Sequence, residues 1–167
     1  MDVYVEQLIV KSPDGKDMAK KVLIVAGALV IVILCFLFFM PFVPILAALV
    51  GFGVMYGAYY LLTGIYCEYE YIVTNGDIDI DKIVGKRKRT RLVSASVKNF
   101  TSFGRLENAP QTSGSITTVK ASDGSGHDFY ADFTHSKLGE TRIIFSPSEK
   151  TLEAIKPFLP RTIKRDF

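Results

Sequence analysis

The sequence has no tryptophan, two cysteines and two histidines in 167 residues. Cys35 and Cys67 provide neither a disulfide framework nor the spacing of a metal site. His127 and His135 are separated by seven residues and have no cysteine near them, so we expect solvated or structural histidines rather than ligands. We therefore predict no metal and no cofactor.

Strong charge imbalance is also lacking, since 20 Lys and Arg face 17 Asp and Glu and the net charge is +3. This balance predicts no nucleic-acid partner. Asp77, Asp79 and Asp81 imitate a calcium loop, but Lys82 stands where glycine is needed and Lys88 where glutamate is needed. The Gly-Ser-Gly at 124–126 lacks the lysine and helix of a phosphate loop. With no nucleophile and base signature either, we predict that the protein is not an enzyme.

No charged residue or histidine occurs between Lys21 and Glu68. This stretch holds two apolar runs, 22–40 with 19 residues and 45–66 with 22 residues, joined by Pro41–Pro44. A bilayer core needs roughly 20 apolar helical residues. The sequence therefore predicts a transmembrane helical hairpin over 22–66. A secretory signal has a shorter apolar region and a cleavage site, so we expect the first helix to be retained.

Lysines and arginines flank the hairpin on both sides, whereas the loop between the runs carries no charge. The positive-inside rule then predicts a multi-pass protein of the cell membrane with both termini in the cytoplasm. A hairpin that dips into one leaflet without crossing is the alternative. Residues 1–21 form a cytoplasmic N-terminal segment, whose first ten residues permit either a strand or an amphipathic helical turn.

Small residues form a stripe on the second run that would let another helix approach closely. Gly53 and Gly57 stand four apart, with Ala47 and Gly51 just before them. We expect packing within the hairpin, and the alternative is homodimerisation through Gly53 and Gly57.

Asn75 and Gly76 separate two alternating segments and favour a type I′ turn, because both residues accept positive φ angles. A two-residue turn pairs Thr74 with Asp77 and sets the register of strands 67–74 and 77–84. One face is then apolar and packs on a core: Tyr69, Tyr71, Val73, Ile78, Ile80 and Val84. The other is acidic and is expected to meet water: Glu68, Glu70, Asp77, Asp79 and Asp81. Glu70 opposite Asp81 should repel.

A basic run follows this hairpin. Because a strand rises about 3.3 Å per residue, a strand that leaves the bilayer at Cys67 returns to the level of Tyr66 at Gly85. The run is therefore expected at the membrane surface, where each cation gains on the order of 1 kcal/mol from an anionic leaflet. These lipid-binding candidates are Lys86, Arg87, Lys88, Arg89 and Arg91. Alternatively they belong to a third strand and neutralise the acidic face, and both interpretations can hold.

Later segments predict strands at 92–97, 116–121, 127–133 and 141–145, with a polar loop at 105–115. The strands 116–121 and 127–133 flank Asp123–Gly126 as a second hairpin. Ser146, Pro147 and Glu149 predict the start of a C-terminal helix over about 147–159, with Ser146 as its cap.

This order of elements resembles the membrane-anchored bacterial pleckstrin-homology-like (PH-like) proteins. The residues that carry the resemblance are Tyr71–Gly76 directly after the second run, the basic stretch leading into Leu92 and Val93, and Phe145–Leu159. The resemblance implies a PH-like domain over 67–167, a bent antiparallel sheet of six or seven strands with a C-terminal capping helix. It also implies binding rather than catalysis.

The sequence thus predicts a non-catalytic integral membrane protein that presents its PH-like domain to anionic lipid headgroups or to a protein partner. The alternative is a structural or assembly subunit that acts through the transmembrane hairpin. The expected partner is the lipid bilayer. Anionic lipids, a membrane protein or a second copy of this chain are further candidates.

Overall fold

The computed structural model describes residues 2–111 and 116–163. The chain divides into two compact units, residues 13–66 and a second made of residues 1–12 with 67–167. We call them the helical unit and the sheet unit. The first twelve residues, which we expected in a separate segment of 1–21, therefore belong with the sheet unit.

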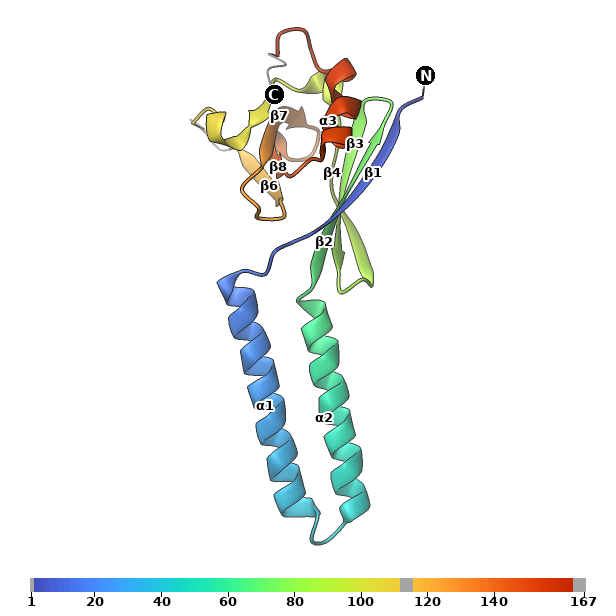
Figure 1. Ribbon diagram of the computed structural model, residues 1–167, viewed down its shortest axis with the longest axis vertical. Coiled ribbons are helices and arrows are strands. Elements are labelled where there is room, and N and C mark those ends of the chain that lie inside the picture. The colour runs from blue at the N-terminus through green and yellow to red at the C-terminus, as the bar shows by residue number, and fades with distance from the viewer. Residues whose placement is uncertain (1, 112–115, 164–167) are drawn as a thin grey trace. The chain divides into compact units, whose positions relative to one another are not determined.

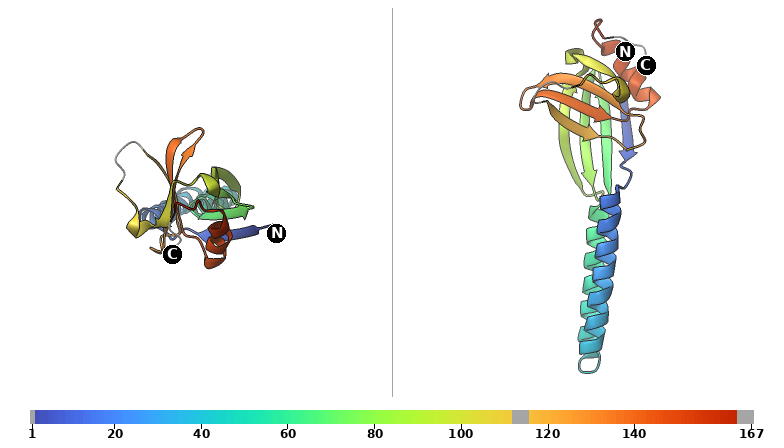
Figure 2. Two further views of the ribbon diagram at one scale, coloured as in Figure 1. Left: turned by 90° about the horizontal axis from the view of Figure 1, so that it is seen from above. Right: turned by 90° about the vertical axis from the view of Figure 1, so that its left-hand side faces the viewer.

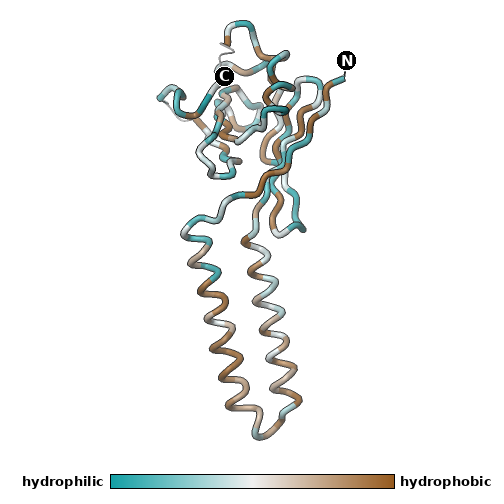
Figure 3. The backbone as a smooth tube through the Cα atoms, in the orientation of Figure 1, coloured by the Kyte–Doolittle hydropathy of each residue, from teal (hydrophilic) through white to brown (hydrophobic). Residues whose placement is uncertain are grey.

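The helical unit contains α1 (Gly15–Phe39) and α2 (Pro44–Gly64) (Figure 1). Both helices are long and apolar enough to cross a membrane by length and composition, and Figure 3 shows brown apolar colouring along most of α1 and a paler mixture along α2. α1 starts at Gly15, before the predicted residue 22. At this start, the carboxylate of Asp17 accepts a hydrogen bond from the N–H of Asp14 at 3.3 Å. Pro44 opens α2, where a missing N–H costs nothing.

Two small residues of the stripe on α2 are buried in the helical unit. Ala47 and Gly51 are buried, and a Cβ added to Gly51 would lie 3.5 Å from the ring of Phe36. A Cβ at Gly53 or Gly57 would meet no atom within 4 Å. A larger side chain at Gly53 or Gly57 would therefore not be hindered by α1.

The sheet unit contains two four-stranded sheets. Sheet A has the order β1-β2-β3-β4 and is antiparallel throughout. Its strands are β1 (Tyr4–Val10), β2 (Cys67–Thr74), β3 (Asp77–Val84) and β4 (Lys88–Ser96). The β2–β3 register is the predicted one, from Thr74 opposite Asp77 to Cys67 opposite Val84. Asn75 and Gly76 have φ angles of 50° and 93°, as a type I′ turn requires.

Sheet B has the order β5-β7-β8-β6. Its strands are β5 (Ser102–Arg105), β6 (Thr117–Ala121), β7 (Phe129–His135) and β8 (Gly139–Phe145). The predicted second hairpin is wrong, because β6 pairs with β8 in parallel while β7 pairs with β5 and β8. The seven residues between Ala121 and Phe129 give the chain enough length to pass from one side of β8 to the other.

The strand count of six or seven is also wrong, since the described residues contain eight strands. The additional strands are β1, which the sequence left undecided, and β5, which lies where a turn was expected. Short 3₁₀ turns follow at Val97–Asn99 and Leu106–Asn108. The latter lies in the predicted loop 105–115, of which 112–115 are outside the described residues.

Both sheets contribute to one core, and Figure 2 shows the strands of sheet B crossing those of sheet A. Tyr71 from sheet A is fully buried, and its ring meets Phe145 from sheet B edge-on at 5.6 Å. The Tyr71 hydroxyl donates to the carbonyl of Ala121 and accepts from the N–H of Ser146 at 3.1 Å. Burial raises the pKa of this hydroxyl.

The C-terminal helix α3 spans Glu149–Ile155 and continues as a 3₁₀ turn over Lys156–Phe158. Its cap is Ser148 rather than the predicted Ser146, and the Ser148 hydroxyl accepts from the N–H of Thr151 at 3.3 Å. The α-helix ends before Pro157 because proline cannot donate to the preceding turn. Gln7 of β1 holds the start of α3, accepting from the Thr151 hydroxyl at 2.6 Å and from the Ser148 N–H at 2.7 Å.

Candidate functional site

The candidate site is the outer face of sheet A, the side turned away from the core. Cross-strand pairs share a face, so the register defines its members. Six acidic side chains lie on it together with two arginines, and the formal charge of the face is −4. The acidic residues are Glu6, Glu68, Glu70, Asp77, Asp79 and Asp81, and the arginines are Arg89 and Arg91.

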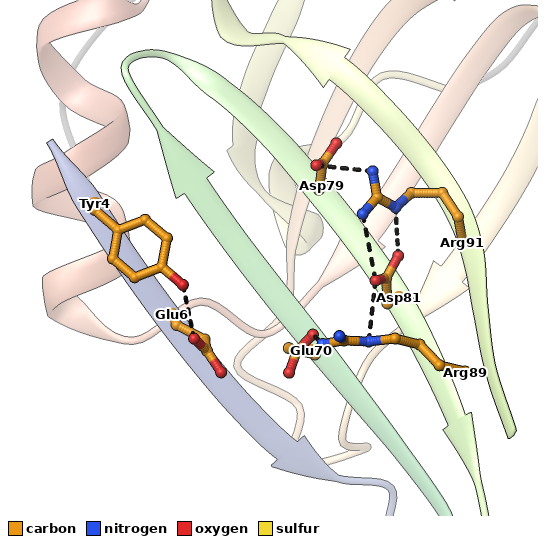
Figure 4. A network of polar contacts seen from close by, with 7 residues as sticks. All are labelled: Tyr4, Glu6, Glu70, Asp79, Asp81, Arg89 and Arg91. Carbon is orange, nitrogen blue, oxygen red and sulfur yellow. Dashed lines mark hydrogen bonds and ion pairs between the residues drawn. The ribbon is translucent and has the colours of Figure 1, made fainter. Parts of the chain in front are cut away.

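An ion-pair network connects β2, β3 and β4 across this face (Figure 4). Arg91 contacts Asp81 at 2.5 Å and Asp79 at 2.8 Å. Arg89 contacts Asp81 at 3.2 Å and pairs with Glu70. The hydrogen bond to Asp81 raises the pKa of Arg91. About half of each arginine side chain is exposed, so each pair stabilises the sheet by only about 0–1 kcal/mol.

The acidic face meets water only in part, because Asp77 is exposed and Asp79 is partly exposed whereas three other carboxylates are buried. Glu68, Glu70 and Asp81 are 7%, 6% and 3% exposed. β4 brings Arg89 and Arg91 alongside Glu70 and Asp81, which relieves the predicted repulsion between these two carboxylates. The predicted neutralising role of the basic run thus applies to these two arginines.

Glu68 differs from the other buried carboxylates because it has no ion-pair or hydrogen-bond partner among the residues that the structure describes. It lies between Val10 of β1 and Ile83 of β3 in the register. Burial of a carboxylate costs free energy unless a partner compensates it. Glu68 therefore carries a charge that no side chain among the described residues compensates.

The five lipid-binding candidates separate into two groups. Lys86 and Arg87 lie in the β3–β4 turn and Lys88 opens β4, and all three are exposed. Arg89 and Arg91 lie over the sheet in the network described above. Val84 pairs with Cys67, so the turn lies at the end of sheet A where the chain passes to and from the helical unit.

The residues that the sequence excluded as ligands lie in a strand and in a turn. Asp77, Asp79 and Asp81 belong to strand β3, which cannot wrap a calcium ion as a loop does. His135 accepts hydrogen bonds at Nδ1 from the N–H groups of Lys137 and Leu138, both at 3.2 Å. It is a turn-stabilising residue. No cluster of potential metal ligands occurs in the described ranges 2–111 and 116–163.

Two cavities in the described residues offer few polar groups that could bind a ligand. A cavity of about 690 Å³ lies in the helical unit near the α1–α2 turn, with an almost entirely apolar lining that includes Leu34, Phe38 and Leu46. A smaller one of about 150 Å³ in sheet B is lined in part by Asp132 and Glu140, but the Asp132 carboxylate is taken by Arg142 at 2.7 Å.

Two sheets around one aromatic core, followed by a C-terminal helix, define the sheet unit as a PH-like domain. Comparison of the sequence with protein families agrees. The family described as bacterial PH-like domain (DUF6106) matches residues 1–165, and the chain belongs to this family. Neither the curated proteins nor the solved structures gave a match. The matched range includes β1 and both apolar helices, and PH-like domains are generally non-catalytic binding modules.

Sequence reasoning missed two features of this surface. β1 was left open between strand and helix, although Val3, Val5, Gln7 and Ile9 alternate with polar or exposed positions. The burial of Glu68 was missed entirely, and no local signal predicts it, because the neighbours that cover it come from other strands.

Proposed function

We propose that the chain is a non-catalytic, multi-pass protein of the cell membrane that holds a PH-like binding domain at the cytoplasmic surface. The way the chain enters and leaves the two apolar helices carries this proposal. Val10 at the end of β1 lies opposite Glu68, and the N–H of Lys11 donates to the carbonyl of Cys67 at 3.0 Å. The hairpin is inserted between two neighbouring strands, so the domain has two short tethers instead of one.

We infer that the β3–β4 turn contacts anionic lipid headgroups. Lys86, Arg87 and Lys88 are exposed, and each cation near an anionic leaflet contributes about 1 kcal/mol. Arg89 and Arg91 contribute less, because their guanidinium groups already face carboxylates of sheet A.

Thiol labelling in intact cells tests the membrane topology. In a chain with Cys35 and Cys67 replaced by Ala, Phe42→Cys is expected to react with an impermeant reagent from outside. Lys98→Cys, an exposed position in the sheet unit, is expected to react only after permeabilisation. The spanning arrangement is refuted by an unreactive Phe42→Cys in intact cells.

Amide exchange of the full chain in nanodiscs tests the lipid contact. We expect the 85–88 segment to exchange more slowly in discs with phosphatidylglycerol than in discs of phosphatidylcholine, and salt to remove the difference. Changing Lys86, Arg87 and Lys88 to Gln should abolish the effect. Lys98→Gln at the opposite end of the sheet is the matched control and should leave it unchanged.

A second candidate is an assembly subunit that acts through α2. The observation that favours it is the open space at Gly53 and Gly57, where an added Cβ meets no atom within 4 Å. Gly53→Leu with Gly57→Leu should then abolish chemical crosslinking of the chain to a partner in membranes. Gly27→Leu on α1, where the space is equally open, is the control, and an equal loss with both changes refutes this role.

A further inference from the structure

The two edges of sheet A differ in how they are protected. β4 carries Lys88, Arg89 and Arg91, and its pairing with β3 shifts register between Ile80 and Asp81. Basic residues and bulges are the usual devices that keep an edge strand from pairing with another chain. β1 has seven residues in unbroken register with β2 and contains no Pro, Gly, Lys or Arg. Its edge is unprotected.

The backbone of β1 is available for pairing. Val3 accepts from the N–H of Asn75 at 2.9 Å and Lys11 donates to Cys67 at 3.0 Å, so the odd-numbered residues form the ladder with β2. Hydrogen-bonded and non-hydrogen-bonded pairs alternate in an antiparallel ladder. The peptide groups of Tyr4, Glu6, Leu8 and Val10 therefore point away from β2, and sheet A has no further strand on that side among the described residues.

The side chains at the same positions are exposed and mostly apolar. Tyr4, Leu8 and Val10 are 62%, 54% and 47% exposed. α3 does not cover them from the inner side of the sheet, since it is held there through Gln7. An added strand would thus find hydrogen-bonding groups at the edge and apolar contacts beside them.

The negative charge of the outer face favours a basic segment as the strand that adds to β1. The face has a formal charge of −4, and Glu68 is nine-tenths buried with no partner among the described residues. Strands lie about 4.8 Å apart, so a strand added to β1 is about 10 Å from β2. A Lys or Arg side chain on that strand, pointing to the outer face, has the length to reach Glu68.

A second copy of this chain fits the edge less well. Antiparallel pairing of β1 with β1 of another copy would join two outer faces that are both acidic. It would also place the two Val10 ends, from which each chain continues toward α1, at opposite ends of the joined sheet, whereas the proposed topology has both chains insert into one bilayer.

We propose that β1 is the docking edge for an extended segment of another protein, which adds as a fifth strand of sheet A and carries Lys or Arg at alternate positions facing the outer side. This rests on the proposed binding function and specifies its partner. Amide exchange of β1 tests the docking proposal, whereas amide exchange of the 85–88 segment tests the lipid contact. Either proposal can therefore fail without the other.

The test uses the full chain in phosphatidylcholine nanodiscs and a labelled peptide of alternating Lys and Val, as long as β1 at seven residues. Fluorescence anisotropy should show saturable binding with Kd below about 1 mM that weakens with salt. The matching peptide of alternating Glu and Val should not bind. On binding, the amides of Tyr4, Glu6, Leu8 and Val10 should become protected from exchange.

Two pairs of variants separate the edge from the charge. Leu8→Pro removes an outward N–H at an edge where proline is tolerated and should weaken binding at least about tenfold, whereas Leu8→Ala keeps the N–H and most of the affinity. Glu68→Gln should weaken binding roughly threefold to tenfold, and Asp77→Asn, far from β1 on the same face, should change it little. Exchange of β2 and β3 amides verifies folding.

The proposal is overturned if neither peptide binds, if both bind equally, or if Leu8→Pro binds as tightly as Leu8→Ala. It is also overturned if the outward amides of β1 are already protected in a dimer of this chain, which makes a second copy the occupant. Protection of these amides by phosphatidylglycerol discs alone would assign the face to the membrane and refute it as well.

Discussion

Replacing Tyr71 by Phe removes a single buried hydroxyl that joins the two sheets. Tyr71 is fully buried in sheet A, and its hydroxyl bonds to Ala121, the last residue of β6, and to Ser146, which follows β8. Phenylalanine keeps the ring and its edge contact with Phe145. The change therefore isolates the polar contribution from the packing contribution.

The expected loss of stability follows from the two backbone groups that lose their hydrogen-bond partner. The N–H of Ser146 and the carbonyl of Ala121 lose their partner at a site closed to water. A buried group left unsatisfied costs about 1–3 kcal/mol. We expect the free energy of opening of the sheet unit to fall by about 2 kcal/mol, which corresponds to roughly 30-fold faster exchange.

Amide exchange of the full chain in mild detergent measures this directly for β2 and β8. Tyr130→Phe is the matched control, because the Tyr130 hydroxyl pairs at 2.8 Å with a partly exposed Ser102 that water can satisfy instead. The control should exchange within about threefold of the parent chain. Exchange of Tyr71→Phe within twofold of the parent chain, or equal effects of the two changes, would refute the reasoning.

Three further outcomes follow. Replacing residues 13–66 by a short Gly-containing turn should give a folded water-soluble domain. Residues 67–167 alone should not fold, because they lack β1. Circular dichroism and thermal melting check both outcomes. Because burial raises the pKa of Tyr71, the unfolded chain loses that proton first, so stability should fall above about pH 10, and less so in Tyr71→Phe. Gly76→Ala should destabilise the sheet unit more than Gly126→Ala in denaturant titrations. Both glycines have positive φ, but only at Gly76 would the Cβ clash, at 2.5 Å from a ring atom.

The sequence predicted those elements whose signals are local. Asn75 and Gly76 set the β2–β3 register in full, because a two-residue turn leaves no freedom in pairing. The apolar runs predicted both helices, although α1 begins at Gly15 rather than at residue 22 and α2 ends at Gly64 rather than at residue 66. The PH-like family was recognised from the segment around Tyr71 and is confirmed by the match over residues 1–165.

The features that the sequence did not predict depend on contacts between distant segments. β1 is a strand because Val5 and Ile9 pair with Val73 and Tyr69, which follow it only after the whole helical unit. The parallel pairing of β6 with β8, instead of a hairpin with β7, depends on which side of β8 the chain passes. Local periodicity carries no information on that choice.

The sequence by itself determined the two apolar helices, the β2–β3 hairpin and the family, since length, hydropathy and turn chemistry act within a few residues. Only the tertiary structure decided that β1 completes sheet A, that Arg89 and Arg91 cover the acidic face, and that Glu68 is left buried without a partner. The reason is physical, because burial and ion pairing depend on side chains that four different strands bring to one surface.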